Sequence, residues 1–138
     1  MNVKEYLKQA FYLDKRINSK LEQVETLNAL ATKATSTLSD MPKNPNKGVS
    51  RLEDTIVKII DLQEEINRDI DRLVDLKKEI SASIFSLKDE EEQTVLEKRY
   101  LCFNSWEQIA VDMNYSMQYC FNVHRNALGK ISIPVKSI

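Results

Sequence analysis

Residues 105–128, SWEQIAVDMNYSMQYCFNVHRNAL, decide how the C-terminal part of this chain folds. Asn104 or Ser105 can cap the start of one helix, because a short polar side chain accepts a hydrogen bond from the free N–H groups of a first turn. Ser116 can cap a second helix in the same way. Asn114 between them tolerates the left-handed backbone conformation that a sharp turn demands. The stretch therefore predicts a helix, a tight turn and a second helix.

The two predicted helices cover Trp106–Met113 and the residues from Ser116 to Lys130, and each has one apolar side. Because Ala110 is small, the two helices can cross closely there. We expect these apolar sides to pack together, with Ile109, Ala110 and Met113 of the first helix against Cys120, Val123, Ala127 and Leu128 of the second.

A further short helix is predicted just before this pair, beginning near Asp89. Residues 90–92 are all Glu and stand in its first turn, where the helix dipole favours carboxylates. We interpret them as dipole-favouring, solubilising residues rather than as a metal or acid-base site. The apolar face of this helix is Val95, Leu96, Tyr100 and Leu101.

Residues 89–131, including VLEKRY at 95–100, resemble the helix-turn-helix of region 4 of bacterial sigma factors. Asn114 stands where Gly is common in that family, and the second helix is less basic than in a typical sigma factor. The resemblance implies that the second helix binds double-stranded DNA. Nothing resembling the basic, aromatic-rich segment with which complete sigma factors melt promoter DNA precedes this part, so we expect the protein to bind duplex without opening it. The low positive charge implies weak binding by one copy, so that dimerisation or a protein partner supplies the remaining free energy.

Residues 1–86 carry two heptad repeats, which predict two long amphipathic helices joined as a helical hairpin or coiled coil. The repeats are Val3, Ala10, Ile17, Val24, Ala31 and Leu38 in the first helix, and Leu52, Ile59, Ile66, Leu73 and Ile80 in the second. Glu64, Glu65, Arg68 and Asp69 are expected on the charged face of the second helix. Gln63 and Lys77 interrupt a secondary stripe, where they either lie at its wet edge or fix register and oligomeric state.

The connection between these helices is predicted over residues 39–50, SDMPKNPNKGVS, because its Pro, Gly, Asn, Ser and Asp residues favour turns. Ser50 followed by Glu53 fits a capping box. The second helix is therefore predicted over residues 51–85. We expect the hairpin to self-associate, because its apolar stripes exceed what one antiparallel contact and a small domain hide.

The composition argues against several classes of protein. With only 2 Gly and 3 Pro in 138 residues, the Gly-rich turns and phosphate loops of α/β and all-β folds have little to be built from. Two Cys and one His are too few for a four-ligand zinc site or a disulfide framework, so no metal or other cofactor is expected. No apolar run approaches membrane-spanning length, and no signal peptide is evident, so a cytoplasmic protein without membrane contact is expected.

Taken whole, the predicted hairpin followed by SWEQIA and YSMQYCFNVHRNAL resembles the small phage and prophage regulators of the ArpU/RinA type. The resemblance implies an all-α fold with a helical hairpin over residues 1–86 and a DNA-binding domain over residues 87–138. It also implies a nucleoid-associated, homo-oligomeric transcriptional regulator that activates late phage genes at a double-stranded DNA promoter, with host RNA polymerase as a possible partner, and not an enzyme. The alternative is a non-catalytic coiled-coil interaction or structural module, which the near-neutral net charge of −1 favours.

The DNA-contacting residues are expected on the second helix of the helix-turn-helix, since its start and outer face meet base edges in the major groove. The base-reading candidates are Met117, Gln118, Tyr119 and Asn122. Gln and Asn suit adenine, and Met or Tyr can touch a thymine methyl group. The phosphate-contacting candidates are Ser105, Ser116, Arg125 and Lys130, followed by Lys98, Arg99 and Lys136.

The remaining distinctive residues are given structural interpretations. Trp106 is expected to pack in the core or at the hinge, and His124 to be a neutral surface or packing residue. Cys102 and Cys120 are expected to be small buried hydrophobic residues.

Overall fold

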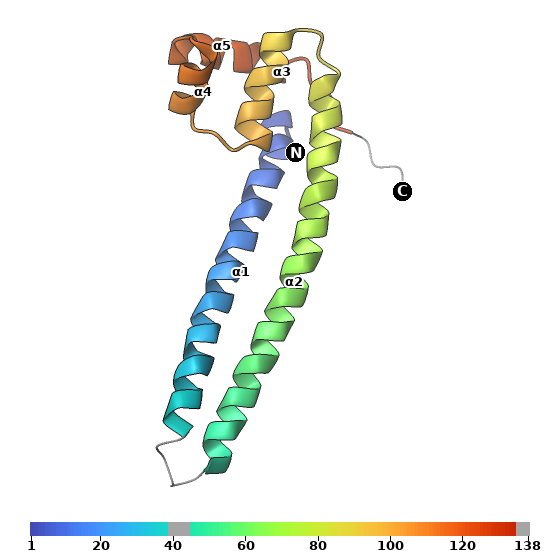
Figure 1. Cartoon of the computed structure of the whole chain (residues 1–138). Coiled ribbons are helices and arrows are strands. Elements are labelled where there is room, and N and C mark those ends of the chain that lie inside the picture. The colour runs from blue at the N-terminus through green and yellow to red at the C-terminus, as the bar shows by residue number, and fades with distance from the viewer. Residues whose placement is uncertain (39–44, 135–138) are drawn as a thin grey trace. The chain divides into compact units, whose positions relative to one another are not determined.

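The computed structural model describes residues 1–38 and 45–134, which are helical over most of their length and contain no strand (Figure 1). The elements are α1 (Val3–Leu38), α2 (Pro45–Phe85), α3 (Glu90–Leu96), a π-helical turn η1 (Glu97–Leu101), α4 (Trp106–Met113) and α5 (Met117–Leu128). The predicted all-α fold class is confirmed.

The contacts divide the chain into two compact units, which are described separately. One unit is Lys15–Arg72, and the other joins Met1–Asp14 to Leu73–Ile138. The domain boundary predicted after residue 86 stays a prediction.

In the unit Lys15–Arg72, α1 and α2 run side by side in opposite directions, as predicted for a hairpin (Figure 1). The heptad positions of both helices face inward, because Ile17, Val24, Ile59 and Ile66 are buried. Apolar side chains recurring every seven residues form one stripe on each helix, and burying the two stripes against each other holds the pair together.

The start of α2 corrects one sequence prediction. The helix begins at Pro45 and not near residue 51, so Ser50 lies inside it and does not open it in a capping box with Glu53. Proline suits a first helical turn, because its fixed φ is already helical and its missing N–H has no partner there. The rest of the predicted loop, residues 39–44, lies outside the described residues.

A buried ion pair joins the two helices of this unit, and it corrects the placement of Asp69 on the charged outer face. Asp69 lies in the contact between α1 and α2, where its carboxylate accepts a hydrogen bond from Lys20 Nζ at 2.6 Å. Glu65 is a second carboxylate near Lys20, at 3.6 Å. The hydrogen bond from Lys20 lowers the pKa of Asp69 below its ordinary value.

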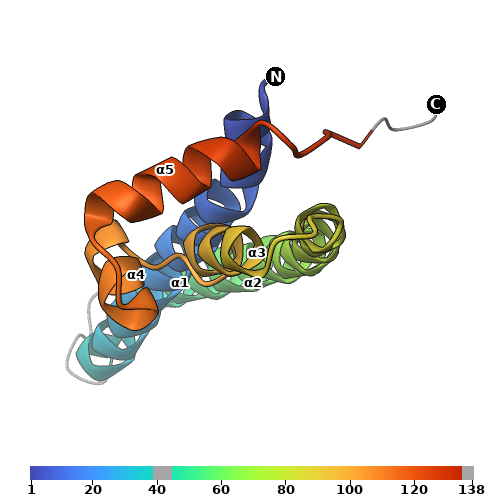
Figure 2. The same cartoon turned by 90° about the horizontal axis from the view of Figure 1, so that it is seen from above.

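The other unit contains two apolar cores, and four α-helices and η1 share the first of them. The first turns of α1 and the last turns of α2 meet α3, η1 and α5 there, and in the view from above α5 lies beside the start of α1 (Figure 2). Its buried residues are Tyr6, Leu7, Ala10, Ile80, Ile84, Leu87, Leu96, Tyr100, Ala127 and Ile131.

A second core holds the helix-turn-helix itself. It consists of Val95, Ile109, Ala110, Cys120 and Val123, with Trp106 and Met113 packed against it. The predicted packing between α4 and α5 is therefore confirmed except at the end of α5, where Ala127 and Leu128 join the first core. The helix α5 ends at Leu128, two residues before the predicted end, and Gly129 forms its C-cap.

Candidate nucleic-acid interface

The caps and the turn between α4 and α5 have the geometry that the sequence predicts. Ser105 accepts a hydrogen bond from the N–H of Gln108 at 3.2 Å, and Ser116 accepts one from the N–H of Tyr119 at 3.1 Å. Asn114 closes α4 in the left-handed conformation, with φ 62° and ψ 36°. These local bonds fix where α5 begins and therefore which of its side chains face outward.

One exposed face of α5 brings together Gln118, Asn122 and Arg125. Spacings of four and three residues place all three on the same side of a helix. Gln118 Nε2 donates to Asn122 Oδ1 at 3.2 Å, so the two amides lie next to each other. An amide side chain can bind both the N6 and N7 atoms of adenine, and a guanidinium can bind phosphate oxygens. This face therefore carries both kinds of group that reading DNA requires.

Met117 and Tyr119, the other base-reading candidates, are also exposed at the start of α5. The Tyr119 hydroxyl donates to Glu91 Oε2 at 2.9 Å, and the Tyr115 hydroxyl donates to the other oxygen of the same carboxylate. These hydrogen bonds to Glu91 raise the pKa of both tyrosines above the ordinary value. The hydroxyl of Tyr119 is therefore held against α3, and the group that it offers to a partner is the ring.

Among the phosphate-contacting candidates, Arg125 is exposed, whereas Lys130 is held by Glu92 of α3. The Lys130 Nζ atom lies 2.7 Å from Glu92 Oε1, and this hydrogen bond raises the pKa of Lys130. Ser105 and Ser116 use their oxygens as cap acceptors, which leaves each hydroxyl hydrogen to donate to an anion.

The further cations of this unit are engaged in structural contacts. Lys98 lies 3.4 Å from Asp112, and Arg99 donates to the Asn104 carbonyl at 3.0 Å while its guanidinium lies over the Trp106 ring. Lys136 lies outside the described residues. Of the described cations on and after α5, Lys130 is paired with Glu92, whereas Arg125 is exposed on the outer face of the helix.

Sequence reasoning missed the tertiary contacts of the α3 acids. Glu92 is only 6% exposed and pairs with Lys130, and Glu91 receives the two tyrosine hydroxyls. The sequence did indicate that Glu92 lies on the apolar face of α3, because Glu92, Val95 and Leu96 follow the i, i+3, i+4 spacing of one helix face. Only Glu90 of the three fits the predicted role of a solvated first-turn acid.

The structural interpretations of Trp106, His124 and Cys120 are confirmed, and that of Cys102 is wrong. The Tyr100 hydroxyl lies 2.6 Å from His124 Nε2, and burial lowers the pKa of His124 to about 4, so its ring is neutral at pH 7. Trp106 packs edge-on against His124 and on the helix-turn-helix core. Cys120 is fully buried, whereas Cys102 follows η1 directly and is exposed.

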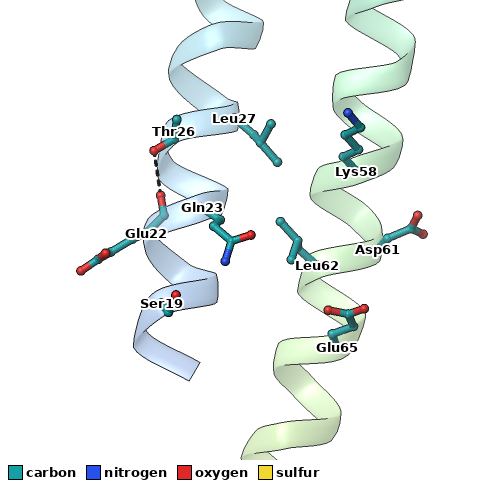
Figure 3. A pocket seen from close by; sticks show the side chains of 9 residues that line it. All are labelled: Ser19, Glu22, Gln23, Thr26, Leu27, Lys58, Asp61, Leu62 and Glu65. Atoms are coloured by element: carbon teal, nitrogen blue, oxygen red, sulfur yellow. Dashed lines mark hydrogen bonds between the residues drawn. The ribbon is translucent and has the colours of Figure 1, made fainter. Parts of the chain in front are cut away.

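A groove between α1 and α2 in the unit Lys15–Arg72 is one of the concave sites among the described residues (Figure 3). Leu27 and Leu62 point toward each other across it, and Lys58 lies on its α2 side (Figure 3). Its carboxylates outnumber this cation, since Glu22, Asp61 and Glu65 also line it. This excess of negative charge does not suit a phosphate backbone, so the groove is not part of the candidate interface.

The part of the chain that the structure describes contains neither a metal-binding cluster nor a membrane-spanning helix. No cluster of three or more His, Cys, Asp or Glu side chains there is arranged to hold a metal ion. None of the helices in that part combines the length and apolar character needed to cross a membrane.

Comparison with known proteins gives a family for this chain but no functional precedent. No curated protein and no solved structure matches it. A family model described as a protein of unknown function, DUF1492, matches residues 43–132. This range contains all of α2, α3, η1, α4 and α5, and it exceeds half of the 138 residues. The chain therefore belongs to the DUF1492 family.

Proposed function

We propose that this protein is a sequence-specific double-stranded DNA-binding transcriptional regulator. The observation that carries the proposal is the exposed face of α5, on which Gln118, Asn122 and Arg125 lie together at the outer side of a capped helix-turn-helix. In this arrangement the amides near the start of α5 reach base edges, and Arg125, about two turns after its first residue, meets the phosphate backbone.

The resemblance to regulators of the ArpU/RinA type extends the proposal to the biological role. The protein would act as an activator of phage late genes, associated with the nucleoid in the host cytoplasm, with no catalytic activity of its own. The hairpin would join copies of the chain, and host RNA polymerase would be a protein partner. Self-association fits the modest number of cations on α5, because two weakly bound copies together bind more tightly than one.

The acids beside α5 affect the strength of this interaction. Glu91 and Glu92 lie close enough to α5 and its C-terminal end to bind Tyr119 and Lys130. A carboxylate near the DNA backbone opposes binding, so we expect one copy to bind non-specific duplex weakly and with a shallow dependence on salt.

The test uses the full chain and a duplex site selected from a random pool, with affinity measured by fluorescence anisotropy at several salt concentrations. Gln118→Ala or Asn122→Ala should each lose about 1–3 kcal/mol at particular base pairs and little at the others. Arg125→Ala should weaken binding to all sequences alike and make the salt slope shallower by about one.

Lys58→Ala is the matched control, because it removes one exposed cation from α2, outside the helix-turn-helix. It should leave both the affinity and the base preference unchanged. Equal, sequence-independent losses for the three α5 variants would show that α5 does not read bases. If even the unaltered chain fails to bind duplex at low salt, the structural or protein-interaction alternative replaces this proposal.

A further inference from the structure

The helix α2 carries a second apolar stripe, separate from the one that faces α1. In the unit Lys15–Arg72, Val49, Ile56, Ile60 and Ile70 are exposed, with Ile60 48% exposed, whereas Ile59, one residue before Ile60, is buried. Large aliphatic side chains gathered along one helix face and open to water mark an interaction surface.

The spacing of this second stripe is that of a coiled-coil seam. Ile56, Ile60, Gln63, Asn67 and Ile70 follow one another by steps of four, three, four and three residues. Positions of this kind lie on one side of a helix and insert between the side chains of a partner helix. The side chains of all five are exposed, so the seam has no partner within the described chain.

The sequence of the seam is complementary to itself when reversed. Reading outward from Glu65, Gln63 corresponds to Asn67, and Ile60 corresponds to Ile70. The sequence of α2 continues the correspondence, with Ile56 matched to Val74. A twofold axis near Glu65 would therefore set apolar residues against apolar residues and an amide against an amide.

We propose that this seam binds the same seam of a second copy of the chain, with the two α2 helices antiparallel. The inference rests on the self-association proposed above and adds the surface and the orientation; it does not depend on DNA binding. A twofold dimer uses one surface twice, so the surface must complement itself, and the reversed order of this seam meets that condition.

Charge separates the antiparallel arrangement from a parallel one. Glu53 occupies the seam position before Ile56, so a parallel pair would bring the two copies of Glu53 together. The antiparallel pair removes this repulsion, because it places the two copies of Glu53 at opposite ends of the seam. The amide layer of Gln63 and Asn67 then lies at the centre, where shifting the helices by one heptad would bury an amide against an isoleucine.

The first experiment measures the mass of the full chain by sedimentation equilibrium over a range of concentrations. The unaltered chain should dimerise, and Ile60→Asp should raise the dissociation constant about 100-fold or more, because each dimer loses two apolar contacts and gains two carboxylates in an apolar seam. Leu30→Asp is the matched control: Leu30 is also an exposed apolar residue, 52% exposed, but lies on α1. It should leave the dissociation constant unchanged.

Two results would overturn this assignment, and they differ in what they imply. A chain that stays monomeric at all concentrations would refute self-association itself. A dimer that Ile60→Asp and Leu30→Asp affect equally would leave self-association standing and refute the seam as its surface. Circular dichroism of both variants should show unchanged helix content, because both positions are exposed in the single chain.

The second experiment tests the orientation by disulfide formation in a Cys102→Ser background, which removes the exposed native thiol. In the antiparallel dimer the two copies of residue 60 lie ten residues apart along the axis, about 15 Å, too far for a disulfide. Ile60→Cys alone and Ile70→Cys alone should therefore stay uncrosslinked, and a mixture of the two should form a crosslinked heterodimer. Crosslinking of each single variant with itself would show a parallel dimer and refute the proposed orientation.

Discussion

Replacing Lys20 by Met tests how the two helices of the unit Lys15–Arg72 are held in register. Asp69 lies between α1 and α2 with its side chain 8% exposed, and the Lys20 ammonium is its closest cation at 2.6 Å. A carboxylate taken out of water keeps its charge only if a partner compensates for the lost hydration. Lys20→Met fills a similar volume but leaves this carboxylate without that partner.

The structure sets the size of the expected loss. Removing one member of a buried ion pair costs about 3–5 kcal/mol. Arg72 Nη1 remains 3.8 Å from Asp69 and offers partial compensation, so we expect the lower end, about 3 kcal/mol. Asp69→Leu should cost less, about 1 kcal/mol, because Lys20 keeps Glu65 at 3.6 Å and stays partly in water.

The double variant Lys20→Met/Asp69→Leu distinguishes an ion pair from ordinary packing. With both charges replaced by apolar groups of similar volume, the free energy of unfolding should return to within about 1 kcal/mol of the unaltered chain. The measurement is urea unfolding followed by far-UV circular dichroism near neutral pH, with the three variants forming a thermodynamic cycle. A double variant whose loss equals the sum of the two single losses would refute the pair as the source of stability.

Acid provides a second check on the same pair. Because the pKa of Asp69 is lower in the folded chain than in the unfolded chain, the stabilisation is complete above the ordinary pKa of about 3.9. It is lost as the pH falls further, through the lowered pKa. The Lys20→Met chain, which lacks the main cause of that shift, should lose less stability over this acidic range than the unaltered chain.

Further predictions concern the unit that contains the helix-turn-helix. Because the pKa of His124 is lowered to about 4 in the folded chain, the free energy of unfolding should fall by about 2 kcal/mol as the pH drops from 6.5 to 4. This is less than the full pKa shift would give, because the ring is partly exposed. The variant His124→Phe should remove this pH dependence. A thiol reagent should label Cys102 rapidly and Cys120 only on unfolding, since burial raises the pKa of Cys120; rapid labelling of both would contradict its burial. Lys130→Met should lower the urea midpoint by leaving the Glu92 carboxylate unpaired, and an unchanged midpoint would show the pair to be unimportant for folding.

Much of the fold could be predicted because it depends on local rules. Ser105 and Ser116 cap helices, and Asn114 turns the chain, through bonds to residues three or four positions away. The heptad stripes are also local, since the repeat alone predicts which face of each helix packs against a partner. The start of α2 was predicted wrongly because Pro45 favours a turn by composition, although proline is equally suited to the first turn of a helix.

The partners of the buried acids could not be predicted by the same rules. Asp69 and Glu92 occupy inward-facing helix positions, but their residue type argued for solvent exposure. The cations that make burial tolerable, Lys20 and Lys130, lie 49 and 38 residues away in the sequence. A local pattern reveals a charged residue on an apolar face, whereas its partner becomes evident only when the fold brings distant segments together.

The candidate DNA-reading face shows the same division. That Gln118, Asn122 and Arg125 share one side of α5 follows from their spacing. The hydrogen bond from the Tyr119 hydroxyl to Glu91 cannot be predicted from local spacing, because it joins residues 28 positions apart. The same holds for the backbone of Phe103, whose φ of 59° follows the π-helical turn η1 and has no sequence signal comparable to that of Asn114.

The two faces of α2 carry different kinds of polar residue, a charged residue on the face toward α1 and neutral amides on the second face. On the face toward α1, Asp69 is buried in the single chain, and a charge there persists because Lys20 is always present on the same polypeptide. On the second face, Gln63 and Asn67 are exposed in the single chain, and in the proposed dimer they would also have to be stable against another helix. Neutral amides meet both conditions, since they lose far less hydration than a charge on burial and can pair with each other. The charged pair therefore suits a permanent contact, and the amide pair suits one that forms and dissociates.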